Sequence, residues 1–230
     1  MRGDAPLWDS EGAVCSSPAF TGTGCFEKGH LFDQGWHTPS INSCCPPNQM
    51  KFSELITIRQ SVRKYLDRPV EEEKIAQVIE AVRLSPSASN SQPWKVIIVN
   101  DPALKEAVAR ATFSTLISFN KFVPQAPIIA VFTIQRPKVI TQIGARLKDR
   151  EFPLIDIGIA AENFCLQAAE LGLGTCMLGW FDESAIQTLL QIPPKTRIGL
   201  LITLGYAADG YPLRKKIRKT SSEMCSFNRY

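Results

Sequence analysis

The order of helical and extended segments predicts a three-layer α/β/α protein, in which helices cover both faces of one central sheet. Strand-like runs at residues 94–99, 126–133, 175–178 and 197–205 are separated by segments whose apolar residues have helical spacing. A long apolar helix at residues 152–172 supplies the centre of the fold. The 230 residues are enough for one domain with a large core, or for two small ones.

Residues 1–49 differ in composition from the rest of the chain. They are rich in Gly, Ser, Pro and Cys without regular apolar spacing, which predicts a disordered or accessory extension. Regular spacing begins at Met50, so we expect one domain over residues 50–230, with Met50 as a candidate natural start. The extension holds both histidines of the chain and four cysteines, whose spacing matches no zinc or iron–sulfur site: His30, His37, Cys15, Cys25, Cys44 and Cys45.

The first patterned segment combines a short helix with a basic, hydroxyl-bearing end. Apolar residues at positions 52, 55, 56 and 58 predict a helix over residues 52–60. Arg59, Ser61 and Arg63 follow, and two guanidinium groups around a hydroxyl are donors that a phosphate dianion prefers. The alternative is a solvated basic face that binds nothing.

A second helix, at residues 69–83, leads into a loop of small polar residues. The helix ends before Pro86, because the residue preceding a proline disfavours the helical conformation. The loop at residues 85–94 places Asn90, Gln92 and Trp94 among serines. It would suit a flat ligand with hydrogen-bonding groups, and a plain surface linker is the alternative.

The middle of the chain is less regular. Asp101 predicts the N-cap of a helix over residues 103–111. Residues 113–122 contain three phenylalanines that would either line a pocket or fill the core. Residues 137–150 have weak amphipathic spacing, which predicts a mobile surface segment.

The helix at residues 152–172 is apolar on nearly every face, which predicts burial nearly all round. One domain of this size rarely surrounds such a helix, so we expect a second subunit over part of it. Gly158, Ala160 and Ala161 are small enough to let another helix approach closely. The alternative is the core helix of a single chain.

The C-terminal third contains a Gly-rich turn, a strand, a helix at residues 183–190 and the last strand. Gly179 follows the strand at residues 175–178, where a backbone can approach a ligand closely. The polar tail carries a basic cluster, which is either solvated or a second phosphate-facing group: Lys215, Lys216, Arg218 and Lys219.

Charge and residue content limit the chemistry. The net charge is +4, of which residues 1–49 carry −3 and the rest +7, an excess that suits a phosphate-bearing ligand or nucleic acid. Seven cysteines without a CxxC pair or a secretory signal predict reduced thiols in the cytoplasm, and no apolar run is long enough for a membrane span. No histidine follows residue 49, which excludes a Ser-His-Asp triad, a Cys-His pair and a histidine-ligated zinc from that part. A phosphate loop and a dinucleotide motif are also missing, so the pattern favours a protein whose cofactor carries the chemistry.

Four blocks of residues occur in the order found in the flavin-dependent nitroreductase family, and the chain from Met50 onward resembles that family. Each block alone is weak, and together they are specific. They are Arg59-x-Ser61-x-Arg63; Ser85-Pro86-Ser87-x-x-Asn90-x-Gln92-Pro93-Trp94; Gly172-Leu173-Gly174-Thr175 through Gly179-Trp180-Phe181-Asp182; and Lys216-x-Arg218-Lys219 near the closing Asn228-Arg229-Tyr230.

The resemblance implies an α+β fold with a mostly antiparallel sheet, built as an intertwined homodimer with FMN at the subunit interface. It implies no catalytic side chain and no metal, because FMN carries the hydride transfer. The implied cofactor-binding residues are Arg59, Gln60, Ser61, Arg63, Lys216 and Arg218 around the phosphate and the polar edge of the ring, Asn90 and Gln92 at the ring or ribityl chain, Leu178 and Gly179 over the ring, and Pro86, Ser87 and Ala88 from the other subunit.

The resemblance further implies an enzyme that uses NADH or NADPH to reduce nitroaromatic, quinone or related small acceptors by a ping-pong mechanism. Residues 113–150 are expected to face the substrate. The alternatives are a flavin-binding sensor without turnover, a flavin-fragmenting relative, and a nucleic-acid-binding module that uses Arg59, Arg63 and the basic tail. The expected partners are the acceptor and a second copy of the chain, without nucleic acid or membrane.

Overall fold

The computed structural model describes residues 50–115, 118–135 and 151–230, which belong to the compact unit Pro47–Tyr230. The expectations for residues 1–49 and for residues 137–150 lie outside the described residues.

One antiparallel sheet forms the centre of the described structure. Its strands are β1 (Trp94–Val99), β2 (Ile128–Ile134), β3 (Gly174–Leu178) and β4 (Ile198–Gly205), in the order β1-β2-β4-β3. All three strand pairs are antiparallel, with Val96 opposite Phe132 in the first pair. The expected α+β class with a mostly antiparallel sheet is confirmed.

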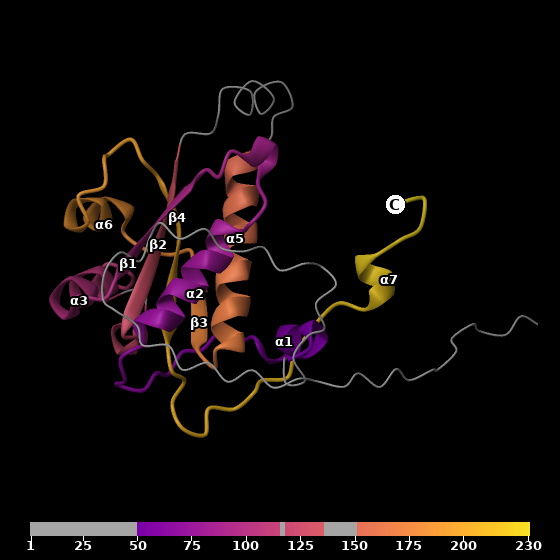
Figure 1. Ribbon diagram of the computed structural model, residues 1–230, viewed down its shortest axis with the longest axis horizontal. Coiled ribbons are helices and arrows are strands. Elements are labelled where there is room, and N and C mark those ends of the chain that lie inside the picture. The colour runs from indigo at the N-terminus through magenta and orange to yellow at the C-terminus, as the bar shows by residue number, and fades with distance from the viewer. Residues whose placement is uncertain (1–49, 116–117, 136–150) are drawn as a thin grey trace, which may run out of the picture. The chain divides into compact units, whose positions relative to one another are not determined.

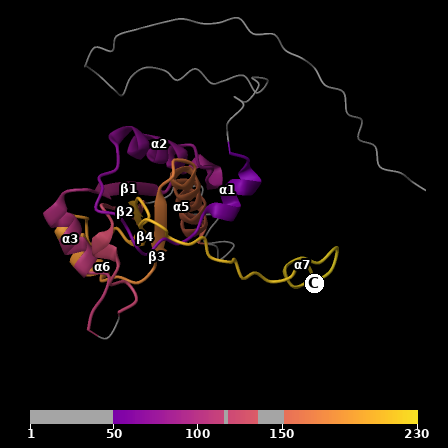
Figure 2. The same ribbon diagram turned by 90° about the horizontal axis from the view of Figure 1, so that it is seen from below.

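Helices cover both faces of this sheet, which gives the three layers seen in Figures 1 and 2. Helices α2 (Glu72–Arg83) and α5 (Phe152–Glu170) lie on one face, and α3 (Pro102–Arg110) and α6 (Glu183–Leu189) on the other. Strand β2 serves both layers, because its side chains alternate between faces. Ile129 and Val131 join the core under α3 and α6, while Ile128, Ala130 and Phe132 join the core under α2 and α5.

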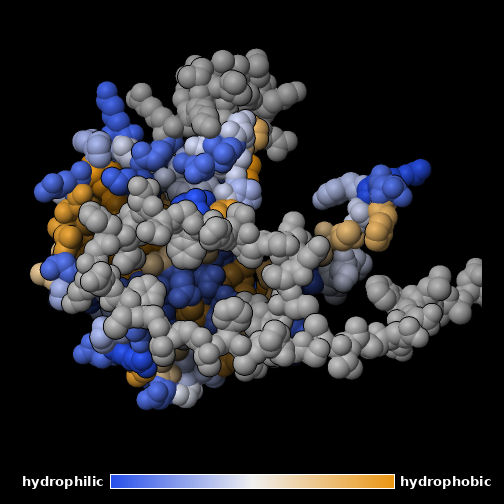
Figure 3. Space-filling view, in the orientation of Figure 1, coloured by the Kyte–Doolittle hydropathy of each residue, from blue (hydrophilic) through white to orange (hydrophobic). Residues whose placement is uncertain are grey.

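The remaining elements are short: α1 (Phe52–Ile58), the 3₁₀ turns η1 (Ala88–Asn90) and η2 (Val123–Gln125), and α7 (Ser221–Met224). The tail around α7 carries apolar side chains that are exposed in the single chain, among them Ile217, Met224 and Phe227. Figure 3 shows this apolar surface beside hydrophilic residues of the same segment.

The predicted elements within the described residues are all present, with bounds that differ by at most three residues. The largest difference is the start of α2, which begins at Glu72 because Glu71 takes the N-cap position and the backbone before it stays extended. Strand β2 begins two residues later than predicted, after Pro127, which has no N–H for the sheet. Asp101 is the predicted N-cap, and its Oδ1 accepts the Leu104 N–H at 2.8 Å.

Helix α5 is buried on one side only. Its buried residues are Asp156, Ile157, Ala160, Ala161, Phe164, Cys165 and Ala168. Leu154, Ile155 and Ile159 are exposed, and a Cβ on Gly158 would meet nothing within 4 Å. In the single chain, the sheet and α2 cover only part of the helix surface. Burial nearly all round would need the expected second subunit, so it stays a prediction.

Candidate functional site

The basic segment after α1 runs along the free edge of β3. Ser61 forms a parallel bridge with Thr175, and the Val62 N–H donates to the Thr175 carbonyl at 2.8 Å. This close approach depends on Gly174, because a Cβ there would lie 2.7 Å from Val62 Cγ2. The edge of the sheet thus fixes the backbone on which Arg59, Ser61 and Arg63 stand.

The chain beyond β4 returns to the same segment. Ala207 pairs with Tyr65 in an antiparallel bridge. Gln60 ties the two stretches together, because its Nε2 donates to the Pro212 carbonyl at 3.1 Å and its Oε1 accepts the Arg214 N–H at 3.0 Å. Both ends of the Gln60 side chain are therefore engaged in holding the basic tail in place.

Positive charges gather where these two stretches meet. Lys216 Nζ donates to the Arg59 carbonyl at 2.5 Å, and Arg59 Nε lies 3.2 Å from Glu162 Oε1. Partial burial, followed by the charges of Arg59 and Arg218, lowers the pKa of Lys216. The Glu162 carboxylate opposes this fall, and a bound anion would offset the repulsion between the cations in the same way.

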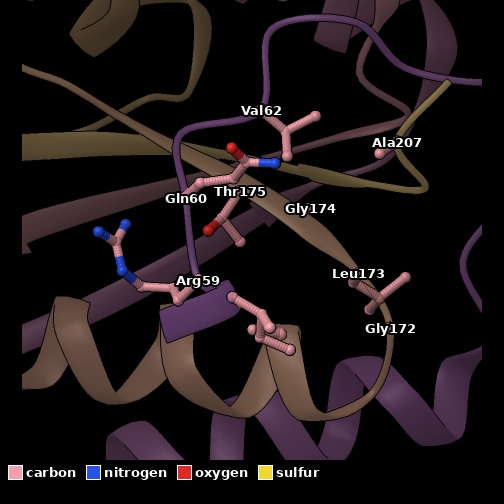
Figure 4. A pocket seen from close by; sticks show the side chains of 10 residues that line it. Arg59, Gln60, Val62, Gly172, Leu173, Gly174, Thr175 and Ala207 are labelled. Atoms are coloured by element: carbon pink, nitrogen blue, oxygen red, sulfur yellow. The ribbon is translucent and has the colours of Figure 1, made fainter. Parts of the chain in front are cut away.

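Two hollows open beside this cluster. The Arg59 pocket, about 180 Å³, lies between the basic segment, the end of α5 and the start of β3. In Figure 4, Arg59, Gln60 and Thr175 lie at one end of the Arg59 pocket, and Gly172 and Leu173 at the other. The Arg63 pocket, about 200 Å³, is lined by Arg63, Phe119, Asn120, Cys176, Met177, Leu178, Gly179 and Trp180.

The Cys176 thiol shows how close the basic side chains come to the Arg63 pocket. Burial raises its pKa, while the Arg63 guanidinium, the Ser61 hydroxyl and then the Arg214 guanidinium oppose that rise. Arg63 therefore stands beside the strand end that carries Leu178 and Gly179. Arg63 and Gly179 thus line the same pocket.

The polar loop between α2 and β1 has a strained backbone. Ser89, Asn90 and Gln92 have φ values of 52°, 49° and 46°, in the left-handed region that residues other than glycine seldom adopt. Gln92 Nε2 donates to Asn90 Oδ1 at 2.8 Å, and the Gln92 N–H donates to Ser87 Oγ at 2.9 Å. Strain of this kind persists only where the surroundings enforce it, and it concentrates at binding sites.

Helix α5 holds this loop through hydrogen bonds of two of its side chains. Asp156, only 3% exposed, accepts the Ala88 N–H at 3.1 Å through Oδ1. Asn163 Nδ2 donates to Ser85 Oγ at 2.8 Å, one helical heptad further along. Among the described residues, the second oxygen of Asp156 has no hydrogen-bond partner.

Comparisons with known proteins agree with this architecture. The model of the family described as "Nitroreductase family" matches residues 56–206, about two thirds of the chain. This chain belongs to the nitroreductase family. A protein of Archaeoglobus fulgidus named "Putative NADH dehydrogenase/NAD(P)H nitroreductase" is 30% identical over 164 residues, which cover 68% of this chain and 85% of that protein.

A second relative and a solved structure extend the comparison. A Bacillus subtilis protein named "FMN reductase [NAD(P)H]" is 30% identical over 166 residues, 67% of this chain and 65% of that protein. The crystal structure of a nitroreductase family protein from Clostridium novyi superposes with a TM-score of 0.60 at 28% identity, covering 70% of this chain and 87% of that one.

The structure of this nitroreductase-family chain brings one group of the predicted residues together. Arg59, Gln60, Arg63, Leu178, Gly179, Lys216 and Arg218 line the two pockets or carry the charges beside them. Ser61 lies between Arg59 and Arg63, at the bridge with Thr175. The second group lies in the loop that Asp156 of α5 holds through the Ala88 N–H, and consists of Pro86, Ser87, Ala88, Asn90 and Gln92. Within residues 50–115, 118–135 and 151–230, no hydrogen bond or ion pair joins the two groups.

Three residues at or beside the two pockets were not among the predicted cofactor-binding residues. Arg214 donates through Nη2 to Tyr211 Oη at 3.0 Å, and the same Tyr211 oxygen accepts the Arg63 N–H at 3.1 Å. The position of Arg214 directly before the basic cluster of the tail could have indicated this residue. Asn120 and Trp180 lie in the Arg63 pocket. Asn120 belongs to the segment expected to face the substrate and Trp180 to the third block of the resemblance, but neither was given a role of its own.

Two further findings concern the described residues alone. None of their helices has the length and apolar character needed to cross a membrane. Their His, Cys, Asp and Glu side chains form no group of three or more that could hold a metal ion.

Proposed function

We propose that this chain is an NAD(P)H-dependent flavin oxidoreductase that reduces nitroaromatic, quinone or related small acceptors with FMN as its cofactor. The observation that carries the proposal is the cation cluster of Arg59, Lys216 and Arg218, placed beside a pocket that contains Gly179 and Arg63. FMN has a phosphate dianion at one end and a flat ring at the other, and these two features fit the cluster and the pocket.

The residues have separate tasks in this proposal. Arg59, Ser61, Lys216 and Arg218 bind the phosphate, and the forked guanidinium groups give that contact its direction. Arg63 faces the polar edge of the ring, where negative charge is more stable beside a cation. The Gly179 N–H donates to the ring from the strand end. Bound FMN supplies acceptance and donation of hydride, so no side chain needs to act as a catalyst.

The loop of Ser87, Ala88, Asn90 and Gln92 completes the site in a homodimer. The loop contacts Asp156, near the start of α5, and makes no hydrogen bond or ion pair with the cation cluster among the described residues of its own chain. Its strained backbone conformation is already formed in the single chain, before a ligand binds. The exposed residues Leu154, Ile155 and Ile159 of α5 offer the apolar surface that a second copy would cover. FMN would then lie between the cluster of one subunit and the loop of the other.

The reductant and the acceptor would use one open face in turn, which is a ping-pong mechanism. The Arg63 pocket supports this proposal, because it is a single hollow beside Gly179 and is open to solvent. Parallel double-reciprocal plots are expected. Intersecting plots, with a ternary complex that is required for turnover, would contradict a shared face.

The decisive experiment is a visible absorption spectrum of the purified full chain, before and after anaerobic addition of NADH or NADPH. Flavin bands that bleach on addition support the proposal. Lys216→Met should weaken FMN binding about tenfold or more, because it removes a charge-assisted contact, while the matched control Lys195→Met, outside the cluster, should leave it unchanged. A chain that takes up no added FMN would refute the proposal, and bound flavin that is not bleached would favour a sensor or a flavin-fragmenting enzyme.

A further inference from the structure

Two exposed aromatic side chains form a pair at the Arg63 pocket. Phe119 is 62% exposed and Trp180 is 56% exposed, and both line the pocket. Their ring centroids are 6.4 Å apart, with an angle of 73° between the ring planes. This is the edge-to-face arrangement that aromatic rings prefer. Single exposed apolar residues need no explanation, but a paired set at a pocket edge marks a binding surface.

A buried amide holds this pair in place. Asn120 is 4% exposed, and its Nδ2 donates to the carbonyls of Thr112 and Trp180, at 3.0 and 3.1 Å. Both amide hydrogens are thereby used, as burial of a polar group requires. The Asp182 N–H adds a second tie by donating to the Ala111 carbonyl at 2.7 Å. The two loops that carry the aromatic rings are therefore fixed to each other.

We propose that Phe119 and Trp180 are specificity-determining residues that form an aromatic wall for a flat, aromatic acceptor, and that Asn120 is their positioning residue. A flat ring gains stacking energy against such a wall, while an aliphatic or inorganic acceptor does not. A rigid wall also loses little side-chain freedom when the acceptor binds. The inference rests on the proposed function, because Arg63 and Gly179 must hold the flavin beside the wall.

The substrate class follows from what surrounds the wall. Reduction of a quinone or nitro group places negative charge on its oxygen atoms, and the Arg63 guanidinium in the same pocket stabilises that charge. A quinone takes up two electrons and two protons, which NAD(P)H and the solvent supply through the flavin. Ferricyanide accepts one electron per ion, so two ions balance one NAD(P)H, and it cannot stack.

The test compares 1,4-benzoquinone with ferricyanide in stopped-flow oxidation of the reduced holoenzyme. Trp180→Leu and Phe119→Leu remove a ring but keep an apolar side chain. Each should lower the rate constant with benzoquinone about fivefold, while the rate with ferricyanide stays within twofold. Asn120→Asp should give the same selective loss with both rings present, because its carboxylate cannot donate to the two carbonyls. Phe52→Leu is the matched control, since Phe52 is 66% exposed on α1, and should change neither rate.

A second readout is independent of turnover. Benzoate should bind the oxidised holoenzyme more tightly than cyclohexanecarboxylate, and Trp180→Leu should remove that preference. Equal losses for both oxidants, or no loss for either, would overturn the inference. So would a change in oligomeric state of Trp180→Leu in analytical ultracentrifugation, because the pair would then belong to a subunit interface. Failure of the wild-type chain to hold reducible FMN would instead overturn the proposed function.

Discussion

Replacement of Asp156 by alanine should weaken FMN binding while it leaves the stability of the protein nearly unchanged. Asp156 makes one hydrogen bond, to the Ala88 N–H, and its other oxygen has no partner among the described residues. A hydrogen bond to a charged group contributes about 1.5–3 kcal/mol. Burial of a carboxylate costs several kcal/mol. The two effects largely offset each other, so the free energy of unfolding should change by no more than about 1 kcal/mol.

The expected loss of FMN affinity is not cancelled by an opposing effect. Without Asp156, the loop can release the strain at Ser89, Asn90 and Gln92, each of which costs about 1–3 kcal/mol. FMN would then have to restore the strained conformation when it binds. Restoring even 1–2 kcal/mol of strain lowers the affinity about 5- to 30-fold.

The assay is titration of the apoprotein with FMN, followed by quenching of flavin fluorescence, together with urea unfolding of the same samples. Thr133→Val is the matched control, because its buried hydroxyl on β2 donates to the Lys95 carbonyl and accepts from Gln135 Nε2, and neither contact involves Asp156 or residues 88–92. A dissociation constant of Asp156→Ala within twofold of the wild type would refute the reasoning. An equal loss of affinity in Thr133→Val would do the same, because it would point to a general loss of stability.

Three further changes test the fold. Phe164→Ala removes a fully buried ring at the contact with β2, and urea unfolding should show a loss of about 3–5 kcal/mol; a loss below 1 kcal/mol would contradict its assignment to the core. Gly205→Ala would place a Cβ 2.4 Å from the Pro127 ring and should destabilise by about 1–3 kcal/mol, which a fall in melting temperature would record. The hydrogen bond from Tyr206 lowers the pKa of Glu71 to about 2. The stabilisation that ionised Glu71 gives the folded state is therefore complete above the unfolded pKa near 4.3 and is lost as the pH falls towards 2. The melting temperatures of Glu71→Gln and the wild type should therefore differ at pH 7 and converge near pH 2, and a constant difference would refute this assignment.

The fold could be predicted where neighbouring residues in the sequence form a recognisable pattern. Strand β1 has the predicted bounds because a run of β-branched residues lies between a proline and a capping aspartate. The basic segment was identifiable because Arg59, Ser61 and Arg63 are neighbours in the chain, and the structure keeps them together along β3. Lys216 was predicted from its basic surroundings, and the return of the chain after β4 brings it to Arg59.

Residues whose role depends on distant partners could not be identified from the sequence. Asn120 acts on the Trp180 carbonyl, 60 positions away, and an isolated asparagine has no pattern that reveals this contact. Asp156 was visible only as a polar interruption of an apolar helix, and its contact with Ala88 spans 68 positions. The exposure of Ile155 also depends on tertiary packing, because only the positions of the sheet and α2 decide which side of α5 is covered.

The bridges that join the basic segment to the rest of the fold determine when the site can form. Ser61 pairs with Thr175 and Tyr65 pairs with Ala207, so each bridge closes a loop of more than one hundred residues. Long-range contacts of this kind form late in folding, because the entropy lost in closing a long loop is recovered only when the remaining contacts are made. A chain still emerging from the ribosome lacks Lys216 and Arg218, and with them part of the proposed phosphate site. Loading of the cofactor should therefore wait until Lys216 and Arg218 have joined the fold, so that FMN stabilises folded chains and leaves partly folded ones without a ligand.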